Sequence, residues 1–307
     1  MWPRKGVLSM SEPISRRIEP RARDLGGGFR VRRVLPFHAQ RMVGPFVFFD
    51  HFGPVEYAPG EGFDVRPHPH IGLSTVTYLF EGAIEHRDSL GTDLVIRPGA
   101  VNWMTAGHGI VHSERTPAPE REAGQSMHGL QTWLALPKTH EDIPPAFDHH
   151  PADALPEFNH RGARMRVLAG EAFGKVSPVQ FPWPILYVAF EADEGANLIL
   201  PHTLAEERAV YLVSGSAVIG GETFGEGQML VLARGIDVAI RLEPGTKGVI
   251  CGGAAMDGPR KIEWNFVASD QTLIDQAKQD WQHSVSSGGS DRFPTVPGDE
   301  EEWIPLP

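Results

Sequence analysis

The stretch RPHPHIGLSTVTYLFEG (66–82) places two histidines on either side of Pro69, directly before a run of strand-forming residues. Side chains two positions apart on a strand point to the same face, so His68 and His70 project together. The proline ring stiffens the backbone between them. The segment therefore predicts two imidazoles presented side by side on a β-strand.

A second pair with the same spacing follows in GIVHSE (109–114), where His112 and Glu114 share one face of another expected strand. In an antiparallel barrel, strands this far apart in sequence can lie side by side, with their inward faces meeting in the lumen. Three imidazoles and one carboxylate, without sulfur, favour a borderline divalent ion: Fe(II), Mn, Co, Ni, Cu or Zn. In an octahedral shell, such a set leaves two positions open for water, dioxygen or a chelating substrate.

The rest of the chain favours an all-β fold. Its 34 glycines and 27 prolines separate short runs rich in Val, Ile, Thr, Tyr, Phe and Trp, which is typical of sandwiches and barrels. One helix is predicted over 269–281, with Ser269 as its cap and Leu273, Ala277 and Trp281 on one face. In the tail that follows, Trp303, Ile304 and Leu306 predict that the end of the chain packs on the rest.

The chain reads as two similar halves. The proline-rich stretch 144–160 is interpreted as a loop or linker, with a boundary near residue 145. The motif Tyr-Leu-x-x-Gly occurs at 78–82 and again at 211–215, which indicates an internal duplication of one β unit. Carrying this alignment across puts residues that cannot bind a metal opposite the four candidate ligands: Pro201, Thr203, Ile240 and Leu242. The second half is therefore predicted to be a scaffold, with His202 structural or at the surface.

Composition excludes several function classes. The 307 residues carry a formal net charge of −11, which argues against binding the phosphates of nucleic acids. No apolar run approaches the length of a membrane span, and a lone cysteine, Cys251, fits a buried residue in a reducing compartment, so we expect a cytoplasmic protein. Residues 1–27 are predicted to be a flexible extension, with Met10 as an alternative start; a transit peptide is the competing interpretation.

Other residues are candidates for supporting roles. Asp50, Glu85 and Asp88 are candidate acceptors for the second N–H of a ligating imidazole, with a solvated or turn position as the alternative for each. An apolar pocket for an aromatic ligand would use Phe52, Trp103, Met104 and Trp133, with ordinary core packing as the alternative. His51 and His128 are candidates to face the site, and His108 is either pocket-lining or in a surface loop. Solvent-exposed positions are expected for four further histidines: His86, His149, His150 and His160.

The chain resembles the pirin family of the cupin superfamily. The resemblance lies in the segments that carry these motifs and in three others: PFVFFDHFGP (45–54), HGLQTWLALP (128–137) and residues 258–281. The resemblance implies two tandem cupin (double-stranded β-helix or jelly-roll) barrels and a short C-terminal helix. It implies a metal-binding barrel at 28–145, a metal-free barrel at 146–284 and a packed tail at 285–307. It places iron or a related divalent metal on His68, His70, His112 and Glu114. Ser74 stands where general cupins have a further glutamate, so it is not counted as a ligand.

The resemblance implies two uses for the site. The leading hypothesis is a dioxygenase of the quercetin 2,3-dioxygenase type, acting with dioxygen on a flavonol-like or catechol-like substrate. Fe(II) is the expected metal, and Glu114 alternates between metal ligand and general base. The alternative is a non-catalytic metal or redox sensor that binds regulatory or metabolic protein partners, and a third possibility is a structural zinc site. We expect a monomer, and metal affinity that weakens below about pH 6, because only neutral imidazole binds metal.

Overall fold

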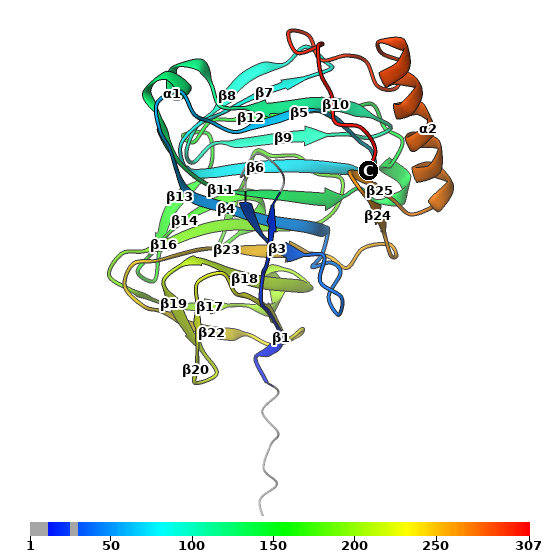
Figure 1. Ribbon diagram of the computed structural model, residues 1–307. Helices are drawn as coiled ribbons and strands as arrows, with labels where there is room; N and C mark the ends of the chain where they lie inside the picture. Colours follow the sequence, from blue (N-terminus) through cyan, green and yellow to red (C-terminus); the bar gives the residue numbers. More distant parts are fainter. Residues whose placement is uncertain (1–11, 25–29) are drawn as a thin grey trace, which may run out of the picture.

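A computed structural model describes residues 12–24 and 30–307 and shows two stacked β-barrels (Figure 1). Each barrel combines one large and one four-stranded antiparallel sheet. The large sheet of the first barrel has the order β12 (Ala146–His150), β9 (Val101–Thr105), β6 (Leu73–Glu81), β11 (Gln125–Ala135), β4 (Phe46–Tyr57), β3 (Arg30–Leu35) and β2 (Arg21–Asp24). Its smaller sheet has the order β5 (Asp64–His70), β10 (Ile110–Arg115), β7 (Ile84–Asp88) and β8 (Asp93–Ile96).

The second barrel repeats this arrangement, which confirms the predicted all-β class with two barrels. Its large sheet has the order β1 (Ile14–Ile18), β21 (Met229–Leu232), β18 (Glu207–Ser214), β23 (Thr246–Gly253), β16 (Ile185–Ala192), β14 (Ala163–Ala172) and β13 (Glu157–His160), with β15 (Lys175–Val176) beside β14. Its smaller sheet has the order β17 (Ala196–Leu200), β22 (Val238–Leu242), β19 (Ser216–Ile219) and β20 (Glu222–Gly225). Short helices lie in the connections: α1 (Ala118–Ala123), η1 (Lys138–His140) and η2 (His202–Leu204).

The two large sheets pack face to face through one hydrophobic cluster that contains residues of both barrels. Phe46 lies edge-on to Tyr187 with ring centroids 5.0 Å apart, and Phe49 lies 4.8 Å from Tyr211. Such aromatic pairs bury large apolar areas and fix the orientation of their rings. The barrels therefore share a core.

The predicted internal duplication agrees with strand topology. Tyr78 on β6 and Tyr211 on β18 both face the shared core, and each strand ends at a glycine with positive φ: Gly82 (83°) and Gly215 (77°). A left-handed turn at the same place in both halves explains why each motif ends in glycine, the residue that adopts this conformation without a steric penalty.

Strand register corrects one part of that alignment. His112 pairs with His68 in the first barrel, and Ile240 pairs with Leu198 in the second. Leu198 and Leu200, rather than Pro201 and Thr203, therefore occupy the positions of the two histidines on β5. Both leucines are buried among apolar side chains, together with Ile240 and Leu242. The second barrel is filled with hydrocarbon where the first carries imidazoles.

The N-terminal segment is not a flexible extension throughout. Residues 14–18 form β1, which pairs with β21 of the second barrel, and residues 21–24 form β2, which pairs with β3 of the first. Ile18 is fully buried in the shared core. The N-terminal strand β1 thus forms the edge of the large sheet of the second barrel, although the first barrel follows it in the sequence. Local sequence could not reveal the pairing of β1 with β21. Met10 lies outside the described residues.

The stretch 144–160 is also more regular than predicted, because it contains β12 and β13. β12 pairs with β9 of the first barrel, so that barrel extends beyond residue 145, while β13 pairs with β14 of the second. His149 is half-buried on β12 and donates from Nδ1 to Oδ1 of Asn102 at 2.7 Å. The prediction that His149 is solvent-exposed is therefore wrong. The domain limits stay a prediction.

The segment after the second barrel returns to cover the first. The hairpin of β24 (Lys261–Glu263) and β25 (Phe266–Ala268) reaches β5 through a bridge between Ile71 and Phe266. Helix α2 (Gln271–Ser287) packs beside it on the first barrel (Figure 1). The covering cluster joins Ile71, directly after β5, to residues of β10, β25, α2 and the tail: Val111, Phe266, Ala268, Ile274, Ala277, Trp281, Phe293 and Val296.

The predicted helix is confirmed, with corrections to its cap and face. Asp270 is the cap and accepts from the backbone N–H of Thr272 at 2.8 Å, whereas Ser269 donates to Glu141. Leu273 is 40% exposed, and Ile274 takes its place on the buried face. In a helix, adjacent positions lie about 100° apart, so a four-residue spacing alone did not decide which of the two faces the core.

The structure also bears on two exclusions made from composition. Cys251 is fully buried in the shared core, and burial raises its thiol pKa to about 12, so it is an inert core residue as predicted. Within residues 12–24 and 30–307, no helix combines the length and apolarity that a membrane crossing needs.

Ile18→Ala tests the closing role of β1. Removing a fully buried isoleucine from the shared core should lower the free energy of unfolding by about 2–5 kcal/mol, since it leaves a cavity. Urea denaturation measures the effect, and Ile199→Ala, at a position 38% exposed on β17, is the matched control with a change of about 0.5 kcal/mol or less. Equal changes in both variants would show that β1 does not support the fold.

Candidate metal centre

Three imidazoles converge inside the first barrel. His68 and His70 lie on β5 and His112 on β10, and their ligand atoms all lie within 4.8 Å of one another. The three residues are 6%, 1% and 1% exposed. The register places His112 directly opposite His68, with ring centroids 4.4 Å apart. Pairing of two strands distant in sequence therefore builds the cluster that the two motifs predicted.

Backbone carbonyls fix the tautomers of the two histidines on β5. Nδ1 of His68 lies 2.8 Å from the carbonyl oxygen of Arg66, and Nδ1 of His70 lies 3.0 Å from that of Asn265. A carbonyl only accepts hydrogen bonds, so each Nδ1 carries the proton and each Nε2 keeps its lone pair. Asn265 comes from the turn of the β24–β25 hairpin, where Trp264 adopts φ 54°. The covering segment thus orients His70.

A buried carboxylate orients His112 through a second histidine. Oδ2 of Asp88 lies 3.1 Å from Nε2 of His86, and Nδ1 of His86 lies 3.4 Å from Nδ1 of His112. Because the carboxylate accepts from Nε2 of His86, the other nitrogen of that ring is the acceptor for His112. Nε2 of His112 is then unprotonated, and it is buried without a hydrogen-bond partner. An orphaned acceptor beside two others is a ready ligand for a cation.

His86 was predicted to be solvated, and this is wrong. It is 3% exposed, between Asp88 and His112 on the inward face of β7. The sequence held a signal, since His86 and Asp88 are two positions apart and so share a face. Of the three candidate carboxylates, Asp88 supports the cluster, Glu85 pairs with Arg87, and Asp50 pairs with Arg33.

Burial keeps the three imidazoles neutral. It lowers the pKa of His68 to about 4, against the opposing effect of the Arg66 carbonyl. Burial and neighbouring imidazoles hold the pKa values of His70 and His112 well below the usual value. Protons should therefore compete with a metal only at lower pH than the value of about 6 expected from free imidazole.

Glu114 lies in the cavity beside the cluster without being part of the close group. A bulge in the β10–β5 pairing falls between His112 and Glu114, so the backbone of Glu114 pairs with Val65 on β5 and with His86 on β7. Its Oε1 lies 3.2 Å from Oγ1 of Thr77, which is itself 2.7 Å from Oε1 of Gln131. Burial raises the pKa of Glu114. The carboxyl group therefore binds a proton more readily than an exposed glutamate does.

A cavity of about 640 Å³ opens beside His68, His70 and Glu114. One wall is aromatic: Phe48 stacks on Trp133 with centroids 4.0 Å apart, and Trp133 lies edge-on to His70 at 5.1 Å. Two of the four predicted pocket residues, Phe52 and Trp133, line this cavity. The other two, Trp103 and Met104, belong to the hydrophobic core. Lining residues that sequence reasoning missed are Arg33, Gln131, Trp264, Asn265 and Ile304.

His51 and His128 do not face the site. Their Nε2 atoms are 2.7 Å apart, and Nδ1 of His51 lies 2.7 Å from the hydroxyl of Tyr211 in the second barrel. They belong to the contact between barrels, because inward and outward side chains alternate along β4 and β11. Buried Ser74 bonds Thr105, which agrees with its exclusion as a ligand.

Three further histidines also lie outside the cavity. His108 bonds the carbonyl of Ile143 rather than lining the pocket. His202 pairs with Asp237 at the surface, as predicted. His160 is not simply solvated, because its ring packs 4.3 Å from Phe173.

The chain is similar to known proteins over most of its length. A family model described as Pirin matches residues 28–134, and one described as Pirin C-terminal cupin domain matches residues 187–286. A pirin-like protein of Caulobacter vibrioides is 48% identical over 94% of this chain and 98% of its own length. A Pseudomonas aeruginosa protein named "Putative quercetin 2,3-dioxygenase" is 38% identical over 96% and 92%.

Solved structures agree. A crystal structure of quercetin 2,3-dioxygenase from Acinetobacter baumannii is 34% identical and superposes with a TM-score of 0.86, covering 95% of this chain and 94% of that one. The similarity therefore extends over both barrels.

Asp88→Asn tests the orientation of His112. An amide N–H facing His86 would make Nε2 of that ring an acceptor, and the proton would move through Nδ1 so that Nε2 of His112 becomes protonated. Zinc affinity, measured by competition with a chelating dye, should fall about 10- to 100-fold. Glu85→Gln, on the same strand but paired with surface Arg87, is the control and should change affinity less than about 2-fold. Unchanged affinity in Asp88→Asn would contradict the assigned tautomers.

The lowered pKa values also predict how stability depends on pH in metal-free protein. Between about pH 6.5 and pH 4, His68 takes up a proton when unfolded but not when folded, so the free energy of unfolding falls as pH falls through this window. His68→Gln should reduce the slope by up to about 1.4 kcal/mol per pH unit. Urea denaturation in EDTA at several pH values measures it. His283→Gln, an exposed position on α2, should keep the parental slope; an unchanged slope in His68→Gln would refute the shift.

Proposed function

Given that the chain belongs to the pirin family, we propose that it is a metal-dependent dioxygenase acting on a flavonol-like or catechol-like substrate. The observation that carries the proposal is the cavity of about 640 Å³ directly beside the buried histidine cluster. A structural zinc site is usually closed by four protein ligands, whereas a catalytic site keeps a position open. The pirin and quercetin 2,3-dioxygenase relatives support the same reaction class.

We propose His68, His70 and His112 as the metal ligands, with Glu114 as a fourth. The available lone pairs, the unpartnered Nε2 of His112 and the sulfur-free donor set fit Fe(II), which is the proposed metal; Mn, Co, Ni, Cu or Zn suit the same donors. When bound, such an ion supplies Lewis acidity toward a substrate oxygen, and a redox-active ion such as Fe(II) also supplies access to dioxygen chemistry.

The residues of the chain would bind and orient the substrate. A planar aromatic ring fits an apolar wall formed by Phe48, Phe52 and Trp133. Glu114 would take the proton of the substrate hydroxyl, since its raised pKa brings it closer to the working pH. The hydroxyl of Thr77 would hold the carboxylate in place.

Turnover of quercetin tests the function. Fe(II)-loaded protein should consume dioxygen and bleach the flavonol absorbance, and Glu114→Gln should lower kcat about 10²- to 10⁴-fold because the proton acceptor is lost. His70→Ala should lose both metal and activity, whereas His202→Ala, in the second barrel, should retain both.

Metal content measured on each sample separates loss of metal from loss of chemistry. Dioxygen consumption that is no higher in the parent than in His70→Ala would refute the enzyme. It would favour the non-catalytic alternative, in which the metal state controls binding to a protein partner.

A further inference from the structure

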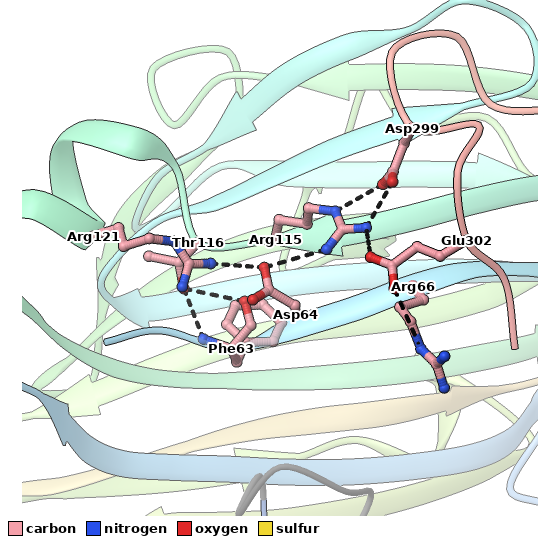
Figure 2. A network of polar contacts seen from close by, with 8 residues as sticks. All are labelled: Phe63, Asp64, Arg66, Arg115, Thr116, Arg121, Asp299 and Glu302. Atoms are coloured by element: carbon pink, nitrogen blue, oxygen red, sulfur yellow. Dashed lines mark hydrogen bonds and ion pairs between the residues drawn. The ribbon is translucent and has the colours of Figure 1, made fainter. Parts of the chain in front are cut away.

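A segment near the end of the chain lies beside the cavity, and we name Asp299–Ile304 the C-terminal strap. It follows α2 and passes beside β5 and β10, the two strands that carry the histidine cluster (Figure 2). The backbone N–H of Ile304 donates to the carbonyl of Pro67 at 2.8 Å, next to His68. The strap therefore lies against the exposed edge of the strand that bears two candidate ligands.

Ionic contacts fix the strap to the rim. Asp299 makes a two-point contact with Arg115, at 2.7 Å to Nε and 2.6 Å to Nη2, and Glu302 lies 2.7 Å from the same guanidinium (Figure 2). Nε of Arg66, a residue that lines the cavity, is 4.0 Å from Glu302. Bidentate carboxylate–arginine pairs combine strength with a defined geometry. The side chains of Asp299 and Glu302 thus hold the strap to β10, and Glu302 also lies near Arg66 of β5.

Ile304 is the strap residue that enters the cavity wall. Its backbone is held on both sides, because its carbonyl also accepts from Nε1 of Trp281 on α2 at 3.1 Å. With the backbone held at N–H and C=O, the β-branched side chain has few rotamers available. The adjacent Trp303 is 39% exposed and does not line this cavity. One apolar side chain from the end of the chain therefore forms part of the wall beside His68.

We propose that Ile304 is a specificity-determining residue that sets how large a planar ligand fits between the strap and the histidine cluster. The inference rests on the proposed function only for the choice of ligand. Under this proposal, a one-ring catechol occupies less of the cavity than a flavonol and depends less on the space beside Ile304. A three-ring flavonol fills more of the cavity that His68, His70 and Ile304 all line, so its fit depends more on the size of residue 304. The size of residue 304 thus changes the binding of the two ligands unequally.

Equilibrium binding of quercetin and catechol to zinc-loaded protein under argon tests the proposal without turnover. Ile304→Trp should raise the ratio of the quercetin Kd to the catechol Kd at least 10-fold, with the catechol Kd within 2-fold of the parent. Ile304→Ala should change the quercetin Kd at least 3-fold and leave that of catechol unchanged. Trp303→Ala is the matched control, and its ratio should stay within 2-fold of the parent.

A third test variant, Asp299→Asn with Glu302→Gln, loosens the strap without altering the wall and should shift the same ratio at least 3-fold. A ratio equal to that of the parent in all three test variants, with folding confirmed by thermal denaturation, overturns the proposal. A parent that binds quercetin but consumes no dioxygen refutes the proposed enzyme and leaves the binding ratios as the test of Ile304.

Discussion

The site depends on three imidazoles that are buried together with their lone pairs directed to one place. Neutral histidines grouped in a barrel interior are costly unless each N–H is hydrogen-bonded, and here each Nδ1 has an acceptor: the carbonyls of Arg66 and Asn265, and the ring of His86. Because those acceptors are fixed by strands and by a hairpin, the tautomers are fixed too. The polar shell around the cluster therefore determines which atoms are free to bind a cation.

The second barrel shows what the same scaffold does without that polar shell. Leu198, Leu200 and Ile240 stand at the positions of His68, His70 and His112, and the interior is continuous hydrocarbon. Burying such side chains stabilises the barrel by roughly 1.5–3 kcal/mol each. The first barrel has imidazoles and a cavity in place of this apolar packing. Its stability therefore depends more on the core that the two barrels share and on the C-terminal segment that covers the first barrel.

Segments distant in sequence complete the first barrel. Asn265 orients His70, α2 packs over β5 and β10, and Asp299 and Glu302 hold the strap to Arg115. In return, β1 from the N-terminal part of the chain closes the large sheet of the second barrel. The N-terminal strand therefore completes the second barrel, and the C-terminal segment covers the first. A substitution in either terminal region affects the barrel that is more distant from it in sequence.

The sequence by itself determined the all-β class, the duplication and the inward pairs at 68/70 and 112/114, because period-two alternation, turn glycines and metal-ligand chemistry are local properties. It was also sufficient for the terminal helix, apart from its cap at Asp270 and the choice of Ile274 over Leu273. Only tertiary structure decided that β1 joins the second barrel, that His86 supports His112, that His51 faces Tyr211 instead of the cavity, and that Ile304 lines it. Those outcomes depend on strand register and on contacts between residues that lie, in some cases, more than two hundred positions apart, which no local pattern encodes.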